Sequence, residues 1–217
     1  MLPDAFLSTL LLLGGLPNTN VFYAPNGDLH VIGDAGANDV LMDAGVGYKR
    51  VRVPFGQSLN GIPGPTEFRL DPVQGVLRIS LGDGDDVFFI MSNIADRRVF
   101  DMGAGDDFID VGNVVSTHTT ILAGDGDDHV HTEDCSYDTL EVDLGAGADD
   151  FEVAFTLIYR AITVDAGTGA DRVRLRRSLF FGPVFAYGGL GVDSFLDILS
   201  EFAERPTVNG FESKLVR

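Results

Sequence analysis

Apolar and polar residues alternate around six copies of one short glycine-containing segment. Two positions after the aspartate that ends each copy the residue is always apolar, while the positions on either side of it are mixed and mostly polar. The residues at this apolar position are Phe88, Ile109, Val130, Phe151, Val173 and Phe195. Alternation with a period of two predicts a β-strand that has one face in a core.

The residues before each copy alternate in the same way. Directly before the first glycine stand Leu81, Met102, Ala123, Leu144 and Ala166. Two residues earlier stand Ile79, Phe100, Ile121, Val142 and Val164, and the polar residues between the two sets include Asp101, Asp143 and Asp165. Each unit is therefore predicted to contain a strand, a variable connection, a second strand and a Gly-Asp turn.

The six segments share the pattern G-x-G-x-D and recur at a nearly constant spacing. They occupy residues 82–86, 103–107, 124–128, 145–149, 167–171 and 189–193, and their starts are 21, 21, 21, 22 and 22 residues apart. A fixed period of this size is typical of a solenoid in which each repeat is one coil. The sequence thus predicts an all-β parallel β-helix, or β-solenoid, with 21-to-22-residue coils and parallel pairing between neighbouring coils.

The chain divides into four predicted parts. Residues 1–19 contain the apolar stretch 5–16, which is too short to span a bilayer as a helix and which we expect to cap the solenoid rather than to act as a leader. Residues 20–81 are expected to form degenerate coils with a hairpin at Asn26-Gly27 and a degraded copy of the turn at 34–39. Residues 82–198 form the regular solenoid and 199–217 a C-terminal cap. The connections at 92–97, 135–139 and 177–182 are expected to bulge outward at one edge.

The charge balance narrows the possible partners. The 217 residues include 15 Lys and Arg against 33 Asp and Glu, a net charge of −18. Such an excess of acid argues against a nucleic-acid partner and against docking to anionic lipid. It favours either a soluble surface or the recruitment of cations. Cys135 is the single cysteine, so no disulfide can form within the chain.

The repeated aspartate points to a cation. Stacking would place one carboxylate above the next at about 4.8 Å, the spacing between paired strands. Two carboxylates this close repel by about 1 kcal/mol in water and by several times more near a protein surface. A divalent ion between them would remove the repulsion, and hard oxygen ligands favour Ca²⁺.

The motif also resembles a known family. G-x-G-x-D followed by x-apolar-x is similar to the haemolysin-type, or repeats-in-toxin, calcium-binding repeat. That family carries its motif at both edges of a shorter coil, whereas this chain has one motif per coil and doubles the glycine only at Gly188-Gly189. The one-motif arrangement looks more like the calcium-bound β-solenoids of certain bacterial adhesins, and residues 167–171 are the nearest match.

The resemblance implies a set of calcium ligands. The carboxylates would come from Asp86, Asp107, Asp128, Asp149, Asp171 and Asp193. The carbonyl oxygens would come from the motif glycines, namely Gly82, Gly84, Gly103, Gly105, Gly124, Gly126, Gly145, Gly147, Gly167 and Gly169.

These inferences together predict a calcium-binding structural or adhesive module at the cell surface or outside the cell, with several Ca²⁺ ions and no enzymatic activity. Surface glycans or other surface proteins are the expected partners, and no transmembrane span is expected. Two alternatives stay open: a polysaccharide-binding or polysaccharide-cleaving β-helix protein, and an accessory subunit of a larger assembly.

One outward column could suggest catalysis instead. Asp110, His131, Glu152 and Arg174 occupy the same position in successive coils. Acid–base chemistry needs a concave pocket and orienting partners, and a flat sheet face provides neither. Lateral pairing of opposite charges is the simpler expectation for this column, and local charge compensation is the simpler one for the arginines at 172, 174, 176 and 177.

Overall fold

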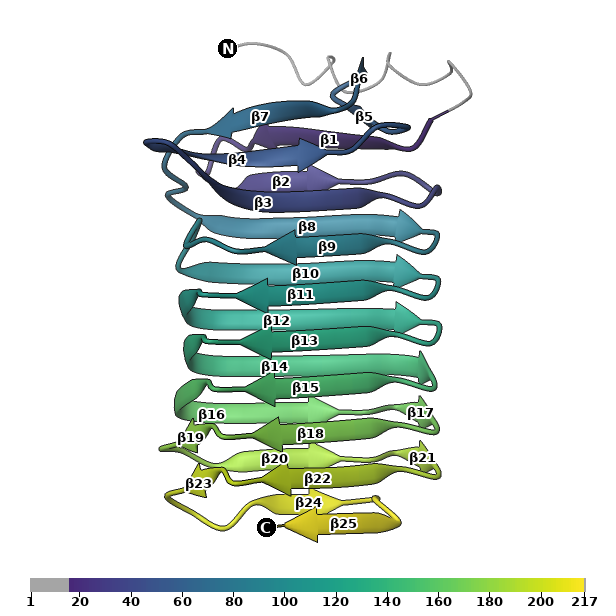
Figure 1. The fold of residues 1–217 in the computed structure, drawn as a ribbon, viewed down its shortest axis with the longest axis vertical. Coiled ribbons are helices and arrows are strands. Elements are labelled where there is room, and N and C mark those ends of the chain that lie inside the picture. Colours follow the sequence, from purple (N-terminus) through teal and green to yellow (C-terminus); the bar gives the residue numbers. More distant parts are fainter. Residues whose placement is uncertain (1–15, 217) are drawn as a thin grey trace.

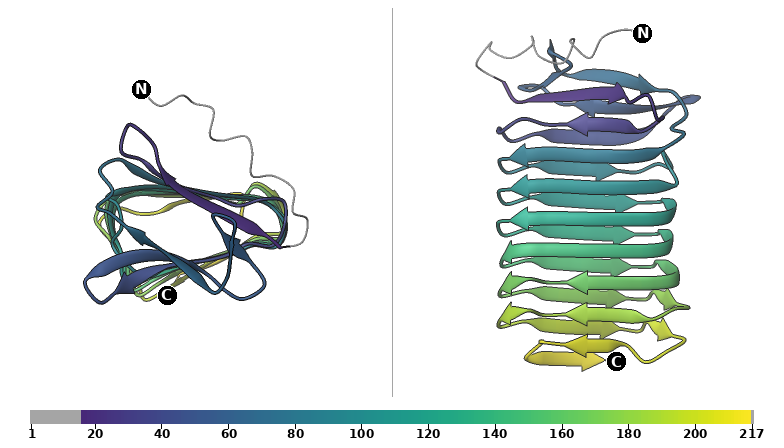
Figure 2. Two further views of the ribbon diagram at one scale, coloured as in Figure 1. Left: turned by 90° about the horizontal axis from the view of Figure 1, so that it is seen from above. Right: turned by 180° about the vertical axis from the view of Figure 1, so that it is seen from behind.

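The described part of the chain is a stack of β-coils. A computed structural model describes residues 16–216, which contain strands, turns and irregular segments (Figure 1). Among these residues there is no helix with the length and hydropathy needed to cross a membrane. Seen along the stack, the coils superimpose as one flattened ring formed by two facing sheets (Figure 2).

Seven successive coils each give one strand to either sheet. The strands of the first sheet are β8 (Val76–Asp83), β10 (Arg97–Ala104), β12 (Val115–Asp125), β14 (Ser136–Gly147), β16 (Leu157–Asp165), β20 (Val184–Tyr187) and β24 (Thr207–Asn209). Those of the second sheet are β9 (Val87–Ile90), β11 (Phe108–Gly112), β13 (His129–Glu133), β15 (Asp150–Ala154), β18 (Arg172–Arg176), β22 (Ser194–Ile198) and β25 (Ser213–Val216). The predicted parallel β-solenoid is confirmed.

Four very short strands extend the two edges of the later coils. Within the Gly-Asp turns lie β17 (Thr168–Gly169) and β21 (Leu190–Gly191). At the opposite edge lie β19 (Leu179–Phe180) and β23 (Glu201–Phe202). All four pair in parallel with the coils next to them.

The pairing register follows the sequence period. Phe100 pairs with Ile121 and Ile121 with Val142, each 21 residues further along the chain. Between β14 and β16 the register shifts after Tyr137, so that Thr139 pairs with Ala161 and Val142 with Val164. The extra residue of the 22-residue coils is therefore taken up in a bulge at Tyr159 and Arg160, on the side away from the Gly-Asp turns.

The apolar residues predicted to point inward form the core. Phe88, Ile109, Val130, Phe151 and Val173 are at most 2% exposed, as are Leu81, Met102 and Leu144 on the other sheet. One continuous cluster of such side chains runs the length of the stack. Since each coil buries its inner face only against its own second strand and its neighbours, the coils stabilise one another in sequence.

The N-terminal coils close the stack with antiparallel pairs. Strands β1 (Asn18–Tyr23) and β2 (Leu29–Ile32) form the hairpin predicted at Asn26-Gly27. Strands β3 (Asp39–Gly45), β4 (Tyr48–Val53) and β7 (Thr66–Leu70) add to the second sheet. Strands β5 (Ser58–Leu59) and β6 (Ile62–Pro63) continue the first sheet beyond β1. Residues 1–15, which hold most of the expected N-terminal cap, lie outside the described residues.

The edge opposite the turns differs from the prediction. Residues 135–139 were expected to bulge outward, but β14 already begins at Ser136. Cys135 and Tyr137 point into the core and are 3% and 0% exposed, because their side chains fill the corner where the coil bends. The chain at this edge is thus drawn inward by burial of two side chains.

Candidate metal centre

The six Gly-Asp turns lie directly above one another at one edge of the solenoid, on the right in Figure 1. The φ angles of Gly103 and Gly105 are 109° and 137°, values that residues with a Cβ rarely adopt. A Cβ on Gly103 would overlap the carbonyl oxygen of Gly82 in the turn above it. The glycines are therefore needed both for the backbone conformation and for the close approach of one turn to the next.

The motif aspartates point inward from these turns. Asp86, Asp107, Asp128, Asp149, Asp171 and Asp193 are all at most 2% exposed. One carboxylate oxygen of each, Oδ1, accepts a hydrogen bond from the backbone N–H at the equivalent position one coil earlier. Asp86 N–H donates to Asp107 at 2.8 Å, and the later steps have lengths of 2.8 to 2.9 Å.

The second oxygen of each carboxylate has no such partner. In the described residues, Oδ2 of all six aspartates is buried and makes no hydrogen bond to protein. Buried polar atoms are nearly always paired with protein, water or an ion. A column of six unpaired oxygens at the same place in successive coils is therefore a repeated feature of the fold.

Burial changes the acidity of this column. Loss of solvent raises the pKa of Asp86, Asp128 and Asp149 to about 7 and that of Asp107 and Asp171 to about 6. These pKa values already include a lowering by the backbone N–H bonds and a raising by the neighbouring carboxylates. Ionising these carboxyls near neutral pH therefore costs free energy, and binding of a proton or a cation would remove that cost.

Two residues outside the six G-x-G-x-D segments continue the hydrogen bonds of the column at its two ends. At the top, the backbone N–H of Asn38 donates to Oδ1 of Asp86 at 2.6 Å. Asn38 belongs to the degraded turn predicted at 34–39, and its carboxamide occupies the place of the motif aspartate. At the bottom, Glu212 accepts the N–H of Asp193 at 2.6 Å. No local pattern marks Glu212, although the adjacent Asn209-Gly210 indicates a turn.

A second set of aspartates binds the turns from outside. Oδ1 of Asp85 accepts the N–H of Asp106 at 3.1 Å, and Oδ1 of Asp106 accepts that of Asp127 at 2.8 Å. Asp127 in turn accepts the N–H of Ala148 at 2.7 Å. These bonds run toward the C-terminal end, opposite to those of the inner column, so the two sets hold each turn from both sides.

The carboxylate and carbonyl oxygens of the turns suit a hard cation, but few of them come from side chains. Nowhere in residues 16–216 do three His, Cys, Asp or Glu side chains come together around one point. Each inner carboxylate offers a single free oxygen, so main-chain carbonyls would have to supply most of the ligands. The carbonyl oxygens of Gly82 and Gly84 lie close to Gly103 and Gly105 of the next turn. In the later turns, the carbonyls of Gly167 and Gly169 each accept one backbone N–H, from Leu190 at 2.9 Å and from Val192 at 3.2 Å. Carboxylate and carbonyl oxygens are the ligands that Ca²⁺ accepts.

The outward column that could suggest catalysis is a set of ion pairs. His131 lies 3.2 Å from Asp110, and Arg174 contacts Glu152 at 2.7 Å and Asp150 at 2.8 Å. Arg176 also reaches Glu152, at 3.3 Å. These contacts are the lateral pairing predicted for the column, and together with Arg172, which lies 3.6 Å from Asp150, they account for three of the four clustered arginines.

Comparison with known proteins adds no relative. No protein-family model, curated protein or solved structure matches the chain. The resemblance to calcium-binding repeats therefore depends on the turn motif and its geometry.

Proposed function

We propose that this protein is a calcium-binding β-solenoid that acts as a structural or adhesive module at the cell surface or outside the cell. The observation that carries the proposal is the column of six buried aspartates, each with one unpaired carboxylate oxygen. Leaving a carboxylate buried and without a counter-charge costs several kcal/mol, so the column requires either protons or cations.

The residues that would hold the ions are those of the stacked turns. Oδ2 of Asp86, Asp107, Asp128, Asp149 and Asp171, together with Asp193 at the lower end, would face the ions, and carbonyl oxygens of the motif glycines would complete the ligands. When bound, Ca²⁺ supplies the positive charge that lets neighbouring carboxylates ionise side by side. The chain itself aligns the oxygens, since the N–H bonds to Oδ1 fix each carboxylate in its corner.

The expected location follows from affinity. Because the charge of the ligands tunes Ca²⁺ affinity, we expect a site in which each carboxylate gives a single oxygen to bind weakly, in the range of extracellular modules at about 10⁻⁴ to 10⁻³ M. Calcium in the extracellular medium is high enough to fill such sites. Folding would then be coupled to the metal, because an unfolded chain has no preformed site.

Thermal unfolding tests the proposal. At pH 7.5 the melting temperature is expected to rise with millimolar Ca²⁺ and to rise much less with Mg²⁺, which demands a stricter octahedral geometry. In Asp107→Asn the rise should be reduced, because the amide nitrogen replaces the free oxygen. Asp101→Asn is the matched control, since Asp101 lies in the same coil but is exposed.

The opposite result would identify protons as the counter-charge. If Ca²⁺ leaves the melting temperature unchanged and Asp107→Asn stabilises the protein at pH 7.5, the column is a set of neutral acids bound to backbone amides. The protein would then be a scaffold whose stability does not depend on metal.

A further inference from the structure

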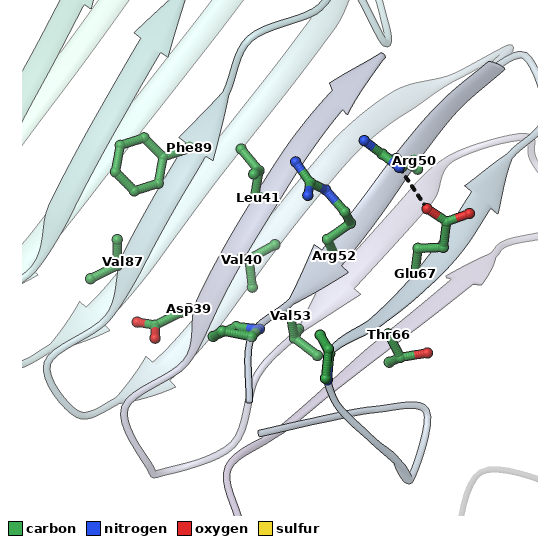
Figure 3. Close-up of a pocket in the computed structure, with 12 residues that line it drawn as sticks. Asp39, Val40, Leu41, Arg50, Arg52, Val53, Thr66, Glu67, Val87 and Phe89 are labelled. Atoms are coloured by element: carbon green, nitrogen blue, oxygen red, sulfur yellow. Dashed lines mark hydrogen bonds and ion pairs between the residues drawn. The ribbon is translucent and has the colours of Figure 1, made fainter. Parts of the chain in front are cut away.

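The outer face of the second sheet has a hollow near its N-terminal end. It has a volume of about 760 Å³ and lies across strands β9, β3, β4 and β7. Figure 3 shows Val87 and Phe89 along one side, with Arg52 and Thr66 across from them. Pockets that hold small ligands have volumes of about 300 to 1,000 Å³ and combine apolar walls with a few polar groups.

Local structure explains why the hollow lies here. Further down the sheet the strands pair in parallel and present a flat face, but β4 and β7 pair antiparallel and are joined by residues 54–65. Pro54 and Pro65, the first and last residues of this connection, line the hollow. The hollow is therefore a feature of the N-terminal coils and not of the repeat.

Aromatic rings extend from the hollow along the sheet. Phe89 lies in its wall, and its ring centre is 5.5 Å from that of Phe108. Phe108 stacks in turn on His129 at 5.0 Å. All three side chains are partly exposed, although the inner face of the same strands already fills the core. Flat apolar rings at a surface offer stacking area to a ligand with an apolar face.

The polar groups of the hollow divide into paired and available ones. Arg50 is held between Asp43 and Glu67, at 2.7 Å from each. Arg52 contacts Asp43 through Nη2 only; its Nε is buried without a hydrogen-bond partner, and its side chain is 38% exposed. Asp39 and Thr66 also line the hollow, and no side chain pairs with the carboxylate of Asp39 among the residues described. A guanidinium, a carboxylate and a hydroxyl thus remain to bind donors and acceptors of a ligand.

The net negative charge of the molecule disfavours an anionic ligand in the hollow. The chain carries a net charge of −18, which repels anions over long range. The hollow itself contains two arginines and two acids, so it has no local excess of positive charge. A neutral ligand with several hydroxyl groups and one apolar face fits this combination better than an anionic one.

We propose that the hollow formed by β3, β4, β7 and β9 binds a pyranose unit of a neutral glycan. The sugar ring stacks on Phe89, and its hydroxyls bond to Arg52, Asp39 and Thr66, while the Phe108–His129 pair continues the stacking surface for an adjoining sugar. This site gives the proposed adhesive module its ligand, but it lies outside the column of aspartates and does not need the metal.

Binding to defined oligosaccharides tests the site. Saturation-transfer NMR and calorimetry would use the full chain with neutral oligosaccharides of glucose, galactose, mannose, xylose and N-acetylglucosamine, and with uronic-acid oligosaccharides for comparison. At least one neutral oligosaccharide should bind. Phe89→Ala should weaken it about tenfold, which corresponds to the loss of one stacking contact. Arg52→Gln should weaken binding as well. The control Phe181→Ala should leave binding unchanged, since Phe181 is an exposed ring at the edge opposite the Gly-Asp turns, outside the hollow.

Three results would overturn the proposal: no neutral oligosaccharide binds, the acidic ones bind better, or Phe89→Ala and Arg52→Gln bind as the parent does. Repeating the titration in Ca²⁺ and in chelator below the melting temperature separates this site from the metal. Loss of glycan binding in Phe89→Ala with an unchanged response to Ca²⁺ would support the hollow alone.

Discussion

At the scale of single residues, the turn glycines set the spacing of the whole stack. Gly103 and Gly47 both have positive φ, 109° and 80°, but their surroundings differ. A Cβ on Gly47 would meet no atom within 4 Å, whereas one on Gly103 would overlap the backbone of the preceding turn. Alanine substitution at Gly47 would therefore measure the cost of backbone strain alone, and substitution at Gly103 would measure strain and crowding together.

We expect Gly47→Ala to lower the free energy of unfolding by about 1 to 2 kcal/mol, the cost of the left-handed conformation. Gly103→Ala should lower it by several kcal/mol, because crowding against backbone adds about 1 to 3 kcal/mol. Urea denaturation of the two variants measures the difference. Equal losses would show that the turns can separate without cost.

Arg98 is a residue that the repeat does not explain. It is 0% exposed and occupies an interior position between Leu77 and Thr119 of the adjoining strands. Its Nη2 donates to the carbonyl of Val115 at 3.1 Å, while Nε and Nη1 are buried without partners. Burying an unpaired charge is costly, and burial accordingly lowers the pKa of this guanidinium.

The substitution Arg98→Leu should raise the free energy of unfolding by about 1 to 4 kcal/mol, because replacing buried charge with apolar volume is often stabilising. Leucine already fills the equivalent position in the preceding coil. Chemical denaturation gives the sign directly. A clear loss of stability would mean that Arg98 has a counter-charge in solution.

At the scale of elements, each edge of the solenoid is held by a ladder of side chains. The Gly-Asp edge uses carboxylates, and the opposite edge uses hydroxyls: the N–H of Cys135 donates to Thr156, that of Thr156 to Ser178 and that of Ser178 to Ser200. Both ladders satisfy backbone groups that the turns leave out of the sheets. Charge makes the aspartate ladder the one that responds to pH and metal.

The aspartate ladder predicts a pH dependence for the metal-free protein. Burial raises the pKa of the five motif carboxyls from Asp86 to Asp171 to about 6 or 7, whereas in the unfolded chain these groups titrate at about 3.9. Between about pH 4 and pH 7 the folded protein therefore binds more protons than the unfolded one, and its stability falls as the pH rises. In chelator, the melting temperature should be higher at pH 5 than at pH 7.5. A maximum near neutral pH would contradict this.

The sequence was enough to predict the coils but not the ladders. Period-two alternation around residues such as Phe88 and Ile109 depends only on which side chains face water, so it predicted the inward positions correctly. The bond from Asp86 N–H to Asp107 joins residues 21 apart, and its direction depends on how the turns stack. The roles of Asn38 and Glu212 were missed for the same reason, since neither lies in an intact motif.

At the scale of the whole molecule, the two ends of the stack differ. At the N-terminal end the outermost strand of the second sheet, β7, pairs antiparallel with β4 and has no second neighbour among the residues described. At the other end, β24 and β25 each pair in parallel with one neighbour only, within the residues described. Solenoids unfold from weakly paired coils, because each coil contacts only its neighbours.

Hydrogen exchange should therefore proceed as a gradient along the stack. Amides of β24 and β25 are expected to exchange first. Amides of β12, β13 and β14 are expected to exchange last, since these strands lie in the middle of the stack with coils on both sides. Mass spectrometry of peptides after timed exchange measures the gradient. Uniform protection from one end to the other would indicate that the chain unfolds as a single unit.

Crystals grown with Ca²⁺ would test the central claim most directly, through anomalous scattering at the Gly-Asp edge. The account predicts peaks between successive turns, each next to the free oxygens of two neighbouring motif aspartates. Aligned turns without anomalous density, with Oδ2 bonded to protein or water, would contradict it.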